Sequence, residues 1–95
     1  MIEVTLSKDA TQGAEVSYGI LNPDAVALVE LLDANEIGYS RTLVRVTLTH
    51  GGQVFVALDG GKLISGHDEH VRRFREFSRT LLQAKSPLAA MSVES

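Results

Sequence analysis

A regular alternation of apolar and polar residues at two places is the feature that most restricts the fold of this chain. The apolar members are Ile2, Val4 and Leu6 in the first segment and Val16, Tyr18 and Ile20 in the second. A repeat of two is typical of a β-strand with one face in the core and the other in water. Residues 8–13 between the segments are mostly polar, so the sequence predicts a β-hairpin at this end of the chain.

Three further strands are expected over residues 42–49, 53–58 and 62–65. The turns between them, residues 50–52 and 59–61, each contain a pair of glycines, which supply the positive φ that tight hairpins require. The middle strand of the three is nearly all apolar. It is therefore expected at the centre of the sheet, with both of its faces covered.

A first helix is expected over residues 24–35. Asn22 is suited to the N-cap, Pro23 to the first helical position, and Asp24 to the positive end of the helix dipole. Its core stripe would consist of Ala25, Leu28, Val29 and Leu32.

A second helix is expected near the C-terminal end. Ser65 and Asp68 have the spacing of a capping box at its start. Its buried face would consist of Val71, Phe74, Phe77 or Ser78, Leu81 and Leu82. Pro87 would end the helix, and residues 86–95 are expected to form a flexible tail.

These elements predict one α+β domain over residues 1–85 with the order β-β-α-β-β-β-α. The chain has 95 residues, of which 44% are hydrophobic, enough for a single core and typical of a globular domain. A mainly antiparallel five-stranded sheet with two helices on one face, in two layers, places every apolar stripe in that core with short connections.

Several function classes find no support in the sequence. The absence of cysteine excludes disulfides, thiolate catalysis and thiolate metal sites, and it fits a cytoplasmic protein. No apolar run approaches the roughly 20 residues that span a bilayer, and no signal peptide is readable at Met1. Lys62 after two glycines lacks the frame of a phosphate-binding loop, and no serine lies in a GxSxG elbow. No cofactor is expected, and an enzyme is the less favoured reading.

Three histidines are the candidate metal ligands. His67 and His70 lie three residues apart at the start of the second helix, and His50 lies in a turn. Imidazole is a good ligand for zinc, but the spacing is not the i, i+4 of an HExxH motif and no third ligand is specified. Histidines exposed to solvent are the favoured interpretation.

Three arginines are the candidate nucleic-acid ligands. Arg72, Arg75 and Arg79 lie on one face of the second helix and suit bidentate contacts with phosphates. Glu69 and Glu76 are spaced to pair with this face, and the net charge of the chain is −3. A salt-bridged face in water is therefore the favoured interpretation, with nucleic-acid binding as an alternative.

Apolar residues outside the expected core are the candidate partner-binding surface. Val26 and Leu31 lie off the stripe of the first helix, and Phe55 and Ala57 lie on a strand whose second face would be uncovered. Apolar patches of this kind commonly mark protein contacts. Leu88 and Met91 in the tail add to the surplus.

The leading hypothesis is therefore a non-catalytic protein–protein interaction module, an adaptor, inhibitor or assembly subunit that forms a homodimer. Its partner-binding residues would be Val26, Leu31, Phe55 and Ala57. The alternatives are a nucleic-acid-binding regulator acting through Arg72, Arg75 and Arg79, and a metal-dependent or dimer-interface enzyme near His50, His67 and His70.

Overall fold

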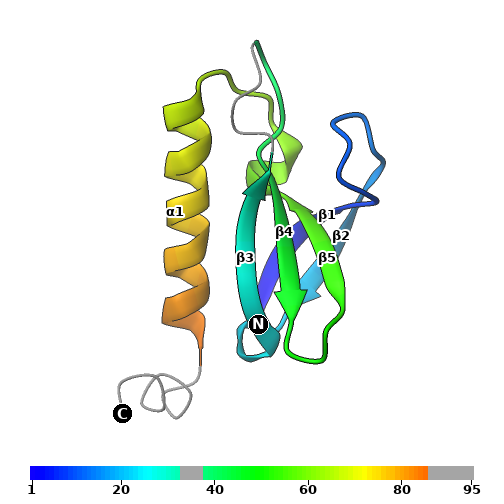
Figure 1. The fold of residues 1–95 in the computed structure, drawn as a ribbon, viewed down its shortest axis with the longest axis vertical. Coiled ribbons are helices and arrows are strands. Elements are labelled where there is room, and N and C mark those ends of the chain that lie inside the picture. Colours follow the sequence, from blue (N-terminus) through cyan, green and yellow to red (C-terminus); the bar gives the residue numbers. More distant parts are fainter. Residues whose placement is uncertain (33–37, 86–95) are drawn as a thin grey trace.

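The computed structural model describes residues 1–32 and 38–85 (Figure 1). Within these ranges the chain forms five strands, two short 3-10 turns and one α-helix. The strands are β1 (Ile2–Ser7), β2 (Val16–Leu21), β3 (Val26–Leu32), β4 (Leu43–Leu48) and β5 (Gln53–Ala57). The turns are η1 (Pro23–Ala25) and η2 (Leu58–Gly61), and the helix is α1 (His67–Ala84). The predicted α+β class with a five-stranded antiparallel sheet is confirmed.

The sheet has the strand order β2-β1-β5-β4-β3, and every neighbouring pair is antiparallel. β1 and β2 form the predicted N-terminal hairpin, β5 is the predicted central strand, and α1 packs on one side of the sheet (Figure 1). The two edge strands, β2 and β3, follow one another in the chain and are joined only by residues 22–25. So short a link between opposite edges requires the sheet to curl, and its concave side encloses the core.

The prediction of a helix over residues 24–35 is wrong. Asn22 does form an N-cap, since its side chain accepts a hydrogen bond from the amide of Asp24 at 3.1 Å, but the element that begins there is only the three-residue turn η1. The chain then continues as β3, which pairs with β4, and residues 33–35 lie outside the described ranges. A bulge between Val26 and Leu28 interrupts the alternation, so this strand lacks the unbroken repeat of two that identifies β1.

The prediction of a strand over residues 62–65 is also wrong. Asp59, Gly60 and Gly61 have φ values of 54°, 67° and 80°, so the chain turns away from the sheet through three left-handed residues after β5. The glycines do supply positive φ as expected, but for η2 instead of a hairpin. Ile64 then forms an isolated bridge with Ser40, through two backbone hydrogen bonds of 2.8 and 2.9 Å.

The C-terminal helix is confirmed, but its predicted capping box is not. Gly66, with a φ of 100°, occupies the N-cap of α1, and no side chain caps the first turn. The helix runs through Ala84, and the predicted tail of residues 86–95, with Pro87, Leu88 and Met91, lies outside the described ranges.

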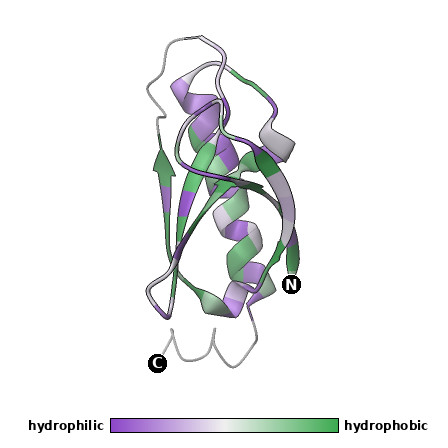
Figure 2. Cartoon of the chain, turned by 90° about the vertical axis from the view of Figure 1, so that its right-hand side faces the viewer, coloured by the Kyte–Doolittle hydropathy of each residue, from purple (hydrophilic) through white to green (hydrophobic). Residues whose placement is uncertain are grey.

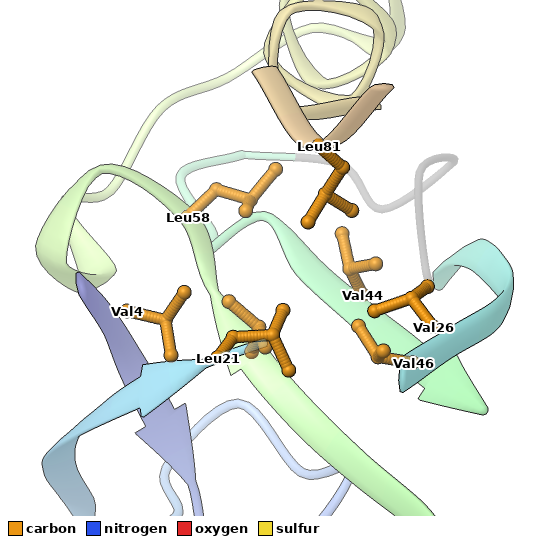
Figure 3. Packing of buried hydrophobic residues seen from close by; sticks show 8 residues of the cluster. Val4, Leu21, Val26, Val44, Val46, Leu58 and Leu81 are labelled. Carbon is orange, nitrogen blue, oxygen red and sulfur yellow. The ribbon is translucent and has the colours of Figure 1, made fainter. Parts of the chain in front are cut away.

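The core lies between α1 and the side of the sheet that faces it. Figure 3 shows seven of its residues by name: Val4, Leu21, Val26, Val44, Val46, Leu58 and Leu81. Phe74 and Phe77 of α1 pack against this cluster. The strand β5 is covered on both faces only at its end, since Val56 and Ala57 are 1% exposed while Val54 and Phe55 are half-buried.

Candidate functional site

The sheet has a second face, on the side opposite α1, and we call it the open face. Figure 2 shows the molecule from this side, with α1 behind the sheet. The strand registers place two rows of side chains on it. The first row is Tyr18, Thr5, Ala57, Leu43 and Leu32, and the second is Val16, Ser7, Phe55, Arg45 and Glu30.

The middle of the open face is closed within the chain itself. Thr5, Leu43 and Ala57 are all less than 9% exposed. The loop between β1 and β2 is tied to the segment that leads into β4, because Gln12 exchanges two side-chain hydrogen bonds with the backbone of Arg41 and the Arg41 guanidinium donates to the carbonyl of Ala14 at 2.8 Å. The accessible part of the face therefore lies toward its edges.

The two most exposed apolar side chains on the open face belong to β2. Val16 is 42% exposed, Tyr18 88% and Ile20 70%. The register explains this exposure, since β1 residues Val4 and Thr5 lie opposite Gly19 and Tyr18. Val16, Tyr18 and Ile20 thus lie on the face opposite to the apolar residues of β1, and of the apolar residues of β2 only Leu21 reaches the core.

The backbone of β2 also leaves hydrogen-bonding groups at the free edge of the sheet. The amide of Lys8 donates to the carbonyl of Glu15 at 2.9 Å, so these residues form a hydrogen-bonded pair at the end of the β1–β2 ladder. Antiparallel pairing alternates such pairs, which turns the N–H and C=O groups of Val16, Tyr18 and Ile20 away from β1. The same three residues therefore present both apolar side chains and backbone groups, and none of the described strands lies beside them. We call this set the β2 surface.

The opposite edge of the sheet has features that block pairing, and among residues 1–32 and 38–85 none of them is found at β2. β3 contains the bulge near Ala27 and the charged residue Glu30, and α1 runs alongside it (Figure 1). Bulges, charges and covering elements are the usual protection of an edge strand. The β2 segment is uncharged, without proline, and paired with β1 in continuous register.

A groove of about 660 Å³ lies beside the β2 surface. Its lining includes Glu3, Tyr18, Ile20, Ala57, Gly60 and Phe77. The groove extends the accessible apolar area from β2 toward η2, and Glu3 adds a carboxylate to its lining.

The predicted partner-binding residues are dispersed by the fold. Val26 is 7% exposed in the core and Ala57 is 1% exposed, so neither offers surface to a partner. Leu31 packs against the core on the side of α1, while Phe55 is half-buried on the open face. The β2 surface was not predicted, because the apolar residues of its alternating pattern were expected in the core. The sequence alone does not show the register between β1 and β2, which turns these residues outward.

The three candidate metal ligands do not come together. His50 lies in the β4–β5 turn, where its Nδ1 accepts a hydrogen bond from the amide of Gly52 at 3.0 Å, and α1 begins at the other end of the molecule (Figure 1). His67 is exposed and His70 is 1% exposed. Among residues 1–32 and 38–85 there is no group of three or more histidine or acidic side chains suited to a metal ion.

His70 instead belongs to a buried polar network at the start of α1. Its Nε2 lies 3.1 Å from Ser40 Oγ, and its Nδ1 lies 2.8 Å from Thr42 Oγ1. Ser40 is 3% exposed and Thr42 is fully buried. A serine next to a histidine is the beginning of a nucleophilic site, but a substrate has no access to these atoms, so the arrangement is structural.

Arg73 joins the same network and lies on the buried face of α1. Its guanidinium donates to the carbonyl of Lys62 at 2.9 Å and to Asp59 Oδ2 at 3.0 Å, and it is 9% exposed. These bonds attach the first half of α1 to η2 and the segment that follows it.

The arginine face is exposed and partly neutralised. Arg72 bonds to Glu69 at 2.7 Å and to Glu76 at 3.1 Å. The hydrogen bond from Arg72 lowers the pKa of Glu69, which keeps the carboxylate charged. Arg75 and Arg79 line the same helix surface as Asp68 and Glu76, so acids are interspersed among the predicted phosphate ligands.

The chain matches no known protein family, and neither the curated proteins nor the solved structures include a match. In the part of the chain that the structure describes, α1 and the other helical segments do not have the length and apolar character required to span a bilayer. The functional interpretation therefore depends on the geometry of the molecule itself.

Proposed function

We propose that the chain is a small, non-catalytic protein-interaction module of the cytoplasm that binds its partner through the β2 surface. The observation that carries this proposal is the coincidence, at Val16, Tyr18 and Ile20, of exposed apolar side chains with a bare sheet edge. Addition of a strand to such an edge is a common mode of protein recognition, in which backbone bonds supply affinity and alternate side chains supply specificity.

Two physical costs favour an occupied edge. An uncharged strand with exposed hydrophobic side chains promotes aggregation when nothing pairs with it. Tyr18, at 88% exposure, also leaves nearly its whole ring in water, although aromatic side chains are among those enriched at protein interfaces. A partner strand removes both costs at once.

The other surfaces support the alternatives less well. Arg72 is already paired with two glutamates, and the histidines are dispersed between a turn and a buried network. The arginine face is accessible but has acids among its three arginines, whereas β2 carries no charge.

The proposal is tested with the double variant Tyr18→Ser/Ile20→Thr. Both side chains are exposed, so the melting temperature of the isolated domain should change by only a few degrees. Association should be lost, as measured by analytical ultracentrifugation of the purified protein and by affinity capture of the tagged protein from its host.

The matched control is Leu28→Thr, which removes a side chain of 52% exposure from the open face at the opposite, β3 edge. This variant should retain every association of the wild type. Identical sedimentation and identical captured proteins for the wild type and the double variant would reject the β2 surface as the binding site.

A further inference from the structure

Building on the proposed function, we infer that the partner of β2 is β2 of a second copy. The two strands pair antiparallel about a two-fold axis that lies between Tyr18 and its own copy. The result is a continuous ten-stranded sheet across the dimer. A two-fold interface brings one surface against itself, so the surface must be complementary to its own copy. The β2 surface meets this requirement in its backbone, its side chains and its charge.

The backbone groups restrict the pairing first. Only Val16, Tyr18 and Ile20 direct N–H and C=O groups to the free edge, so these residues must form the hydrogen-bonded pairs with the partner strand. These three residues occupy alternate positions and share the open face. The two-fold axis must therefore lie between one residue and the same residue of the second copy. An axis placed between two consecutive residues of the strand would put the open faces of the two copies on opposite sides.

The side chains then determine which residue lies at the two-fold axis. With the axis at Tyr18, Tyr18 lies opposite its own copy and Val16 lies opposite Ile20 of the second copy. All three residues are used, giving three hydrogen-bonded pairs and about six backbone hydrogen bonds. With the axis at Ser17 or at Gly19, one of the three falls opposite Ala14 or Asn22, outside the strand.

The charge of the strand and the side-chain pairs across the interface also favour an axis at Tyr18. Residues 16–21 carry no charge, so two copies meet without repulsion along the strand. A tyrosine pair and an aliphatic pair, directly opposed across neighbouring strands, are among the favourable cross-strand contacts. The groove beside Tyr18 and Ile20 adds apolar surface next to the axis on each copy.

The chain contains no cysteine, so single-cysteine variants report the pairing without background. Tyr18→Cys should form a disulfide-linked dimer under mild oxidation, because opposed Cα atoms in a hydrogen-bonded pair lie about 5.5 Å apart, within disulfide range. Val16→Cys alone and Ile20→Cys alone should not, since like positions lie four residues apart, about 13 Å. An equimolar mixture of these two variants should form the mixed dimer, with Tyr18 intact.

Hydrogen exchange gives a second, independent measurement on the wild type. The amides of Val16, Tyr18 and Ile20 face the free edge, so they should exchange quickly at low concentration and become protected as the concentration rises. The amides of Ser17 and Gly19 bond to β1 and should be protected at both concentrations.

The outcomes separate this inference from the proposed function. Wild-type protein that sediments as a monomer at about 100 μM, or Val16→Cys that cross-links to itself more readily than Tyr18→Cys, overturns the β2–β2 dimer. A different protein captured in a manner that depends on Tyr18 and Ile20 would then leave the proposed function standing. Loss of both the dimer and any β2-dependent partner would reject both.

Discussion

The Nδ1 of His70 lies 2.8 Å from the Oγ1 of Thr42, and both side chains are enclosed by the fold. His70 belongs to α1, whereas Thr42 lies one residue before β4. Ser40 bonds to the other ring nitrogen, and Arg73 reaches the same segment one helical turn later. This network attaches the start of α1 to the sheet by polar contacts, while Phe77 and Leu81 attach its second half by apolar ones.

The first prediction concerns the removal of the imidazole. His70→Ala leaves a cavity and two buried hydroxyl groups without their ring partner, and each effect reduces stability. We expect the free energy of unfolding to fall by about 2–4 kcal/mol, measured by urea denaturation followed by circular dichroism. His67→Ala, on the exposed side of the same turn, should change it by less than about 0.5 kcal/mol. Equal losses for the two variants would contradict a structural role of the buried ring.

The second prediction compares two adjacent arginines that both contact acids. Arg73 is 9% exposed and bonds to a backbone carbonyl as well as Asp59, whereas the Arg72 side chain is 57% exposed. Arg73→Met should therefore lower the free energy of unfolding by about 1–3 kcal/mol. Arg72→Met should lower it much less, because exposed ion pairs contribute little. Urea denaturation of both variants tests the difference, and a larger loss for Arg72→Met would contradict the burial of Arg73.

The third prediction concerns two adjacent leucines of α1 that were both expected on its buried face. Leu81 is 4% exposed in the core, while Leu82 is 60% exposed. Leu81→Ala should reduce the stability of the domain by about 2–4 kcal/mol, and Leu82→Ala by less than about 0.5 kcal/mol. Thermal and urea unfolding measure both, and similar losses would show that α1 is rotated relative to this structure.

The sequence was sufficient for the elements with a regular repeat and clear ends. The N-terminal hairpin, β4, β5 and α1 follow from a period of two or of 3.6 residues and from glycine turns. The helix predicted over residues 24–35 is wrong because Leu28, Val29 and Leu32 have the spacing of a helical face although they belong to a strand. In β3, Leu28 and Val29 lie on opposite faces of the sheet, and pairing with β4 decides between the two structures.

The β2 surface could not be predicted from the alternation of apolar and polar residues alone. A repeat of two shows that a strand has two different faces, but only the register with the neighbouring strand decides which face meets the core. Gly19 and not Tyr18 lies opposite Val4, and this one-residue difference turns Val16, Tyr18 and Ile20 toward water. The buried positions of His70 and Arg73 were missed for a related reason, since polar residues were assigned to the solvent side of α1.

The fourth prediction concerns the pH dependence of a cross-strand ion pair. Glu30 and Arg45 lie directly opposite each other on β3 and β4, and they form a bidentate pair with N–O distances of 3.1 and 2.9 Å. The hydrogen bond from Arg45 lowers the pKa of Glu30. A carboxyl group whose pKa is lower in the folded state stabilises the fold above its ordinary pKa, and this contribution disappears as the pH falls through the folded value.

Glu30→Gln should therefore be less stable than the wild type at neutral pH, and the two should converge as the pH drops below about 4.3, the ordinary value for glutamate. The difference is expected to be small, because both side chains are more than one third exposed, and to shrink in high salt. Thermal unfolding at a series of pH values measures it. In an Arg45→Gln background the partner charge is gone, so Glu30→Gln should no longer produce this pH-dependent difference. A difference that persisted there, or that stayed constant down to pH 3 in the wild-type background, would mean that Glu30 acts through packing and not through its charge.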